Sequence, residues 1–253
     1  MPNVTTIPYE FILKNWRIQL TNRAQIFSAV CGPVGALLLF GGLFGAHFIP
    51  PTSPLTTVDN VVSLYREHTT GIRLCGISML FLLTALMTQY TGLSDQLKRI
   101  DSPHASTWAT IQVTLGGMSL VPVYGSALAW AVATYRLDRA PELTLTLNDI
   151  GWFCLVHPVA PALIQMIACG LAVLSDRSAS PMFPRWYGYF SVWIGVVLMA
   201  GLLVPFFKAG PWAWNGLLSF WVDASALGTW LTITSVFMIK VAKRGRAPLA
   251  SRA

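Results

Sequence analysis

Residues 25–48 read QIFSAVCGPVGALLLFGGLFGAHF, a stretch that contains no Lys, Arg, Asp or Glu. A helix needs about 20 consecutive apolar residues to cross the roughly 30 Å hydrocarbon core of a bilayer. Backbone groups cannot stay unpaired in lipid, so a run of this length is predicted to cross as an α-helix. This stretch alone indicates an integral membrane protein.

Five more stretches of similar length and character follow along the chain. In addition to Gln25–Phe48, we predict spans near Ile72–Leu93, Trp108–Tyr135, Gly151–Leu174, Trp186–Phe207 and Trp214–Ile239. Composition agrees, because 54% of the residues are hydrophobic and only 11% are charged. A soluble domain carries roughly 25% charged residues to keep its surface wetted. The predicted fold is an all-α, polytopic transmembrane helical bundle of about six spans in a lipid bilayer.

The net charge of +7 is explained by membrane topology and does not require a nucleic-acid partner. If both termini are cytoplasmic, the twelve positive residues on the inner side are Lys14, Arg17, Arg23, Lys98, Arg99, Arg177, Arg185, Lys240, Lys243, Arg244, Arg246 and Arg252. The five on the outer side are Arg66, Arg73, Arg136, Arg139 and Lys208. This distribution follows the positive-inside rule. We therefore expect a multi-pass protein of the cell (plasma) membrane with both termini in the cytoplasm.

The chain divides into an amphipathic cytoplasmic arm (1–24), the bundle (25–240) and a basic cytoplasmic tail (241–253). In the arm, one helical face would carry Tyr9, Ile12, Leu13, Trp16 and Leu20. Such a stripe is typical of an interfacial helix on the inner leaflet, and a helix packed against the bundle would need the same stripe. Two short extracytoplasmic helices are also expected, one after Thr57 and one beginning at Pro141 and leading into the fourth span.

Asp223 is the most informative polar residue, because it is the one carboxylate expected well inside a span. We place it about nine residues into the last helix and near mid-membrane. An ionisable group there costs roughly 2.5–3.5 kcal/mol on insertion scales, so it usually faces a cavity or a partner. Asn215 and Ser219 share its helical face and extend a polar stripe to the outer surface. The structural alternative is a buried Asp that holds helices together through a hydrogen bond.

Other polar side chains are expected at similar depth in the outer half. His157 precedes Pro158 in the fourth span, and Pro161 follows; two prolines this close free backbone carbonyls and bend a helix. As candidate catalytic residues we name Asp223, Glu67 and His157. As candidate ligand-binding residues we name Tyr124, Asn215, Ser219, Trp221, His47 and His68. The depth of a residue along a span does not determine which way its side chain points around the helix axis. The convergence of these side chains on one site is therefore a hypothesis.

The sequence indicates neither a metal nor a cofactor. The histidines and carboxylates show no pair at ligand spacing. Each of Cys31, Cys75, Cys154 and Cys169 is most simply a small buried hydrophobe, although a Cys75–Cys154 disulfide near the outer surface is conceivable. The Gly116–Gly117 pair, and the Ala224 and Gly228 pair, are interpreted as close helix–helix contacts.

Four stretches carry a resemblance to known proteins: FIPPTSP (48–54), LYREHTTGIR (64–73), FPRWYGYF (183–190) and KAGPWAWNGLLSFW (208–221). They resemble a group of uncharacterised actinobacterial multi-pass membrane proteins with no known activity. The resemblance implies the same topology and location but transfers no functional residue. A looser analogy is to small membrane-embedded terpene cyclases, in which an early and a late acidic residue would correspond to Glu67 and Asp223.

Two functions are therefore compared. In the first, the bundle binds or carries a small apolar or amphipathic molecule, a lipid or an isoprenoid, in an outward-facing cavity. An accessory subunit with an oligomeric or membrane partner is a variant of this function. In the second, the protein is an intramembrane enzyme. A protonated Asp223 would be its general acid on an isoprenoid or lipid, and Tyr124 and Trp221 would stabilise a developing cation. That function predicts a closed apolar pocket with Asp223 at its wall and Glu67 or His157 within reach.

Overall fold

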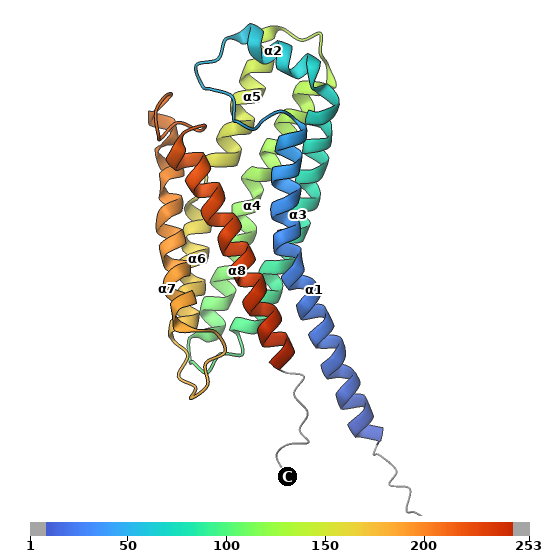
Figure 1. Cartoon of the computed structure of the whole chain (residues 1–253), viewed down its shortest axis with the longest axis vertical. Coiled ribbons are helices and arrows are strands. Elements are labelled where there is room, and N and C mark those ends of the chain that lie inside the picture. Colours follow the sequence, from blue (N-terminus) through green and yellow to red (C-terminus); the bar gives the residue numbers. More distant parts are fainter. Residues whose placement is uncertain (1–8, 245–253) are drawn as a thin grey trace, which may run out of the picture.

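The computed structural model describes residues 9–244, with side chains from residue 22 onward, as a bundle of helices (Figure 1). Its elements in chain order are α1 (Tyr9–Gly45), α2 (Val58–Glu67), α3 (Thr69–Leu97), α4 (Ala105–Tyr135), α5 (Pro141–Val156), α6 (Ala160–Leu174), α7 (Arg185–Val197), the 3₁₀ helix η1 (Leu198–Phe206), the π-helix η2 (Leu217–Val222) and α8 (Asp223–Arg244). No β-strand occurs within residues 9–244. The all-α fold is confirmed.

Six helical stretches in this part of the chain are long and apolar enough to cross a membrane. They are Asn22–Gly45, Thr69–Leu97, Ala105–Tyr135, Pro141–Leu174, Arg185–Phe206 and Leu217–Arg244. The six predicted spans are thus confirmed to within a few residues at most ends. An even number of crossings brings Tyr9 and Arg244 to the same end (Figure 1). We call this the terminal end and the opposite one the α2 end.

The helices pack mainly against their neighbours in the sequence. α1 packs on α3, α3 on α4, α4 on α5 and α6, and α6 on α7. α8 returns to α1, approaching it near the terminal end and diverging from it toward the α2 end (Figure 1). α1 and α3 come so close that a Cβ on Gly71 would collide with the carbonyl oxygen of Gly45. This contact fixes α3 against the end of α1.

The structure changes two details of the expected helices. Residues from Tyr9 onward belong to one continuous helix with the first span, rather than to a separate helix. The side chains of its predicted apolar stripe lie outside the described residues, as do residues 1–8 and 245–253 of the predicted arm and tail. The last α-helix begins at Asp223, so this residue lies nearer to the α2 end of the stretch Leu217–Arg244 than to its middle.

The segments beside the spans fold as the sequence suggests. Thr57 caps α2 by accepting a hydrogen bond from the N–H of Asn60. Tyr65 of α2 is buried and donates to Asn148 Oδ1 of α5 at 3.3 Å. The fourth span is broken between α5 and α6 next to Pro158, which confirms the predicted bend.

Buried amide side chains connect α1, α3 and α8 near the terminal end. Gln25 donates to the Asp95 carboxylate. Gln96 donates to the side-chain oxygen of Gln25 at 2.8 Å and to the carbonyl of Met238 at 3.1 Å. Buried hydrogen-bonded groups of this kind fix one helix register, because any shift leaves them unpaired.

The loop after α6 is organised around one carboxylate outside the spans. Partial burial works against the ionisation of Asp176, but hydrogen bonds from the backbone N–H groups of Ser178 and Met182, each 3.0 Å long, outweigh it and lower the pKa of Asp176. This carboxylate therefore stabilises the loop in its ionised form.

Candidate functional site

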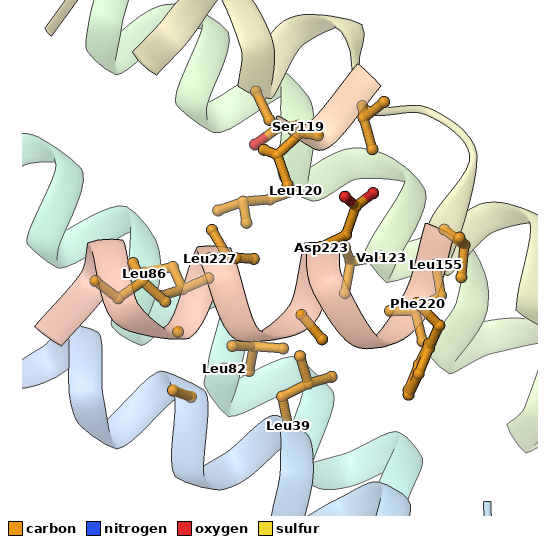
Figure 2. Close-up of a pocket in the computed structure, with 18 of the residues that line it drawn as sticks. Leu39, Leu82, Leu86, Ser119, Leu120, Val123, Leu155, Phe220, Asp223 and Leu227 are labelled. Atoms are coloured by element: carbon orange, nitrogen blue, oxygen red, sulfur yellow. The ribbon is translucent and has the colours of Figure 1, made fainter. Parts of the chain in front are cut away.

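A cavity of about 140 Å³ lies inside the bundle, in the space between the diverging halves of α1 and α8. α3 and α4 form its back wall, and the α5–α6 break closes one side. Figure 2 shows its largely aliphatic lining, which includes Leu39, Leu82, Leu86, Leu120, Val123, Leu155, Phe220 and Leu227. Along α8 it extends from Asp223 to Leu231, which is about 12 Å at the helical rise per residue.

Asp223 is the one charged side chain among the residues that line this cavity. Its side chain extends from α8 into the cavity (Figure 2), and only 8% of the residue is exposed. The backbone N–H of Gly201 lies near the carboxyl group, but it falls short of hydrogen-bond geometry. Both carboxyl oxygens are therefore without a hydrogen-bond partner in the described part of the chain. This is an unusual state for a buried carboxyl group.

The lining carries three hydroxyl groups, those of Ser119, Ser219 and Tyr90, and both serine hydroxyls already donate their protons. Ser119 donates to the carbonyl of Gly116 at 2.7 Å. Ser219 is within donating distance of two carbonyls, that of Ala200 at 3.2 Å and that of Trp212 at 3.1 Å. Asp223 is thus the lining residue with two side-chain oxygens that lack a hydrogen-bond partner in the described part of the chain.

Three interrupted helices meet beside Asp223. η1 is a nine-residue 3₁₀ helix, longer than the usual three or four residues, and the π-helix η2 leads directly into α8. At the α5–α6 break, His157 Nδ1–H donates to the carbonyl of Gly201 at 3.1 Å. Gly201 has no room for a side chain, because an added Cβ would lie 2.5 Å from the carbonyl oxygen of Val156. Irregular backbone at membrane depth is tolerated where protein surrounds it or where it lines a cavity.

An aromatic cluster separates the cavity from the α2 end. Phe48 packs on Trp130 with ring centroids 4.7 Å apart, and Trp130 packs on Trp152 at 5.3 Å. Trp152 contacts Phe220 at 6.0 Å, and Phe220 also lines the cavity. Phe48, Trp130 and Trp152 are fully buried. The cluster therefore closes the cavity toward the α2 end.

Of the nine candidate site residues, Asp223 and Ser219 line the cavity. His157 lies at the helix break beside it and contacts Gly201 instead. Tyr124 and Trp221 lie on outward-facing surfaces, 47% and 41% exposed, and Asn215 is half-buried in the segment before η2. The roles predicted for these residues stay predictions.

The remaining three candidates gather at the α2 end, away from the cavity. The imidazole rings of His47 and His68 stack with centroids 3.8 Å apart and planes 11° apart. Glu67 is exposed next to them. No three His, Cys, Asp or Glu side chains within the described ranges are grouped as metal ligands would be. The structure also shows Cys75 and Cys154 as free thiols, so the conceivable disulfide between them is not formed.

The prediction that Gly228 marks a close helix–helix contact is wrong. The small residues of α8 were expected to mediate close helix packing, but nothing lies within 4 Å of a Cβ added to Gly228. Gly228 and Ala224 both line the cavity instead. By contrast, a Cβ on Gly116 would lie 2.8 Å from the Tyr90 ring, so Gly116 does mark a close contact.

No protein-family model, curated protein sequence or solved structure matches this chain. Inferences about its activity therefore rest on the cavity and on the chemistry of its lining.

Proposed function

We propose that this protein binds a small amphipathic molecule, a lipid or an isoprenoid, in the cavity at Asp223. The observation that carries the proposal is a buried carboxyl group that extends into an apolar cavity without a hydrogen-bond partner. Leaving such a group unpaired costs about 1–3 kcal/mol or more. Ionisable residues inside spans are rare and usually serve substrate or ion pathways. A bound molecule that supplies the missing partner would account for both the cavity and the carboxyl group.

The size of the cavity restricts the occupant. Its volume of about 140 Å³ is close to that of an engineered apolar cavity of about 150 Å³ that binds benzene. The cavity therefore suits the polar head and first carbon atoms of an amphiphile rather than a whole long-chain lipid. The remaining hydrocarbon tail of a longer ligand would extend laterally out of the helix bundle.

The bilayer is the direction from which such a molecule would enter. The aromatic cluster closes the α2 end, whereas α1 and α8 diverge beside the cavity. Gly228 lines the cavity, and a Cβ added to it would meet no atom within 4 Å. The distribution of Lys and Arg supports an extracytoplasmic α2 end in the plasma membrane, so the cavity would draw its ligand from the outer half of the bilayer.

Photolabelling tests this function with a matched pair of variants. Gly228→Leu adds a side chain inside the cavity, and Gly41→Leu adds the same side chain to α1 away from it; neither added Cβ meets another atom within 4 Å. The probe is geraniol with a diazirine on its tail, supplied in nanodiscs. We expect labelled peptides from cavity-lining residues in the wild type and in Gly41→Leu, and their loss in Gly228→Leu. Equal labelling of all three proteins would overturn the proposal.

An intramembrane enzyme is the second candidate, and one observation favours it. A lone carboxyl group in an apolar cavity is placed as a general acid toward an isoprenoid would be. The aromatic side chains proposed to stabilise a cation, Tyr124 and Trp221, do not line the cavity. Incubation of the purified protein with isoprenoid substrates, followed by mass spectrometry of the extract, separates the two candidates: an Asp223-dependent product supports the enzyme, and unchanged substrate supports the binding protein.

A further inference from the structure

We propose that the ligand is an amphipathic alcohol, and that its hydroxyl group is recognised at a single point by the Asp223 carboxyl. This inference rests on the proposed function and specifies the head group. It follows from the carboxyl and hydroxyl side chains that line the cavity, which belong to Asp223, Ser119, Ser219 and Tyr90.

Anionic head groups do not fit this site. A phosphate or carboxylate head needs cationic side chains or several N–H donors, and among the described residues no Lys, Arg or His lines the cavity. The backbone N–H of Gly201, which lies near Asp223, is a single group within η1. The Asp223 carboxyl itself would repel an anion when it is ionised. Ionised fatty acids and isoprenoid diphosphates, which carry such head groups, are therefore excluded as ligands of this cavity.

An ammonium head is also poorly matched. A primary ammonium presents three N–H donors together with a full charge. That charge would have to be paired with an ionised Asp223 inside an apolar cavity. Removing two charges from water costs several kcal/mol per ion, which their mutual attraction offsets only when the geometry is excellent. An uncharged head group avoids this cost.

A hydroxyl group matches the site in the number of hydrogen bonds that it makes and in having no charge. It has one proton to donate and lone pairs that accept. Its proton can go to one oxygen of Asp223, and its own oxygen can accept from the Asp223 carboxyl when that group is protonated. The apolar remainder then contacts the aliphatic walls formed by residues such as Leu39, Leu82 and Leu227. This pairing is complete without any additional charge.

The test compares three diazirine probes that share one isoprenoid tail. They are geraniol, its methyl ether, which accepts but cannot donate, and geranylamine. Competition labelling of the wild-type protein in nanodiscs should show geraniol binding about two- to tenfold more tightly than the ether, as expected for one hydrogen bond. Asp223→Leu should remove this preference. Asp223→Asn keeps an acceptor oxygen, so it should retain part of the preference for geraniol.

Each outcome has a distinct meaning. If the wild type labels all three probes equally in the cavity, the alcohol inference is wrong while the proposed binding function stands. A preference for geranylamine that disappears in Asp223→Asn would assign an ammonium head and overturn the inference. Absence of cavity labelling by any probe would overturn both proposals. The Gly41→Leu protein serves as the folded control throughout.

Discussion

Replacing Asp223 with Leu should make the ligand-free protein more stable. In most membrane proteins the loss of a buried polar side chain breaks hydrogen bonds and weakens helix association. Here both carboxyl oxygens are without partners, so the substitution breaks none. The larger leucine side chain also has room, because Asp223 borders open cavity volume. The substitution therefore removes an unfavourable group without creating a clash.

The expected gain in the free energy of unfolding follows from the free-energy cost of keeping the Asp223 carboxyl group buried without a partner. An unsatisfied buried polar group costs about 1–3 kcal/mol, and an Asp near the centre of a span costs roughly 2.5–3.5 kcal/mol on insertion scales. Asp223 lies nearer to one end than to the centre, so the lower range applies, and we expect a gain of about 1–3 kcal/mol. For a chain of this length that corresponds to a rise in Tm of roughly 2–12 °C.

The assay is thermal unfolding of delipidated protein in detergent, followed by tryptophan fluorescence. Delipidation matters, because a bound ligand would stabilise the wild type selectively. Asp223→Asn is the control: it keeps a polar group of the same size without partners, so its stability should change little. A loss of more than about 1 kcal/mol in Asp223→Leu would show that the carboxyl group has stabilising partners, and it would refute the reasoning behind both proposals.

Three further substitutions test the packing and the polar contacts. Gly71→Ala should destabilise the protein by about 1–3 kcal/mol, because the new methyl group collides with the Gly45 carbonyl; an unchanged Tm would contradict the close approach of α1 and α3. Asp95→Leu should cost about 1 kcal/mol in the same assay, since Gln25 loses its acceptor, and a gain would argue against that contact. The pKa of Asp176 is lower in the folded protein than its ordinary value of 3.8, so the ionised carboxylate stabilises the fold at any pH above 3.8. This stabilisation is lost as the pH falls below 3.8 and the carboxylate becomes protonated in the folded protein. The stability difference between wild type and Asp176→Asn, measured from pH 7 down to pH 3, should therefore shrink toward the acid end; a constant difference would contradict it.

The sequence predicts the number and the position of the candidate spans well, because each span is a local property. Length and hydropathy determine whether a stretch can cross, and Thr57 and Pro158 mark a helix start and a helix break through short-range rules. Each of these features appears in the structure where it was expected. None of them requires knowledge of which helices are neighbours.

The composition of the site was harder to predict, because it depends on the direction in which each helix face points. Tyr124 and Asp223 were both expected in the outer half, yet Tyr124 is 47% exposed and Asp223 extends into the cavity. Hydropathy gives depth along a span but not rotation about its axis. Rotation is set by tertiary packing and by the π-helix before α8, which changes the register of the residues that follow. Neither has a clear signal in a single sequence.

Asp223 differs from the other buried groups that lack a hydrogen-bond partner. Among the described residues these include the side chains of Gln112, Gln165, Trp130 and Trp152. Those groups are neutral, and none of them lines the cavity. A polar group that faces close-packed side chains cannot gain a partner without repacking the bundle, whereas one that faces open volume can gain a partner by binding a ligand. The same unmet hydrogen bond is therefore a fixed cost at Gln112, whereas at Asp223 it is the basis of the proposed ligand binding.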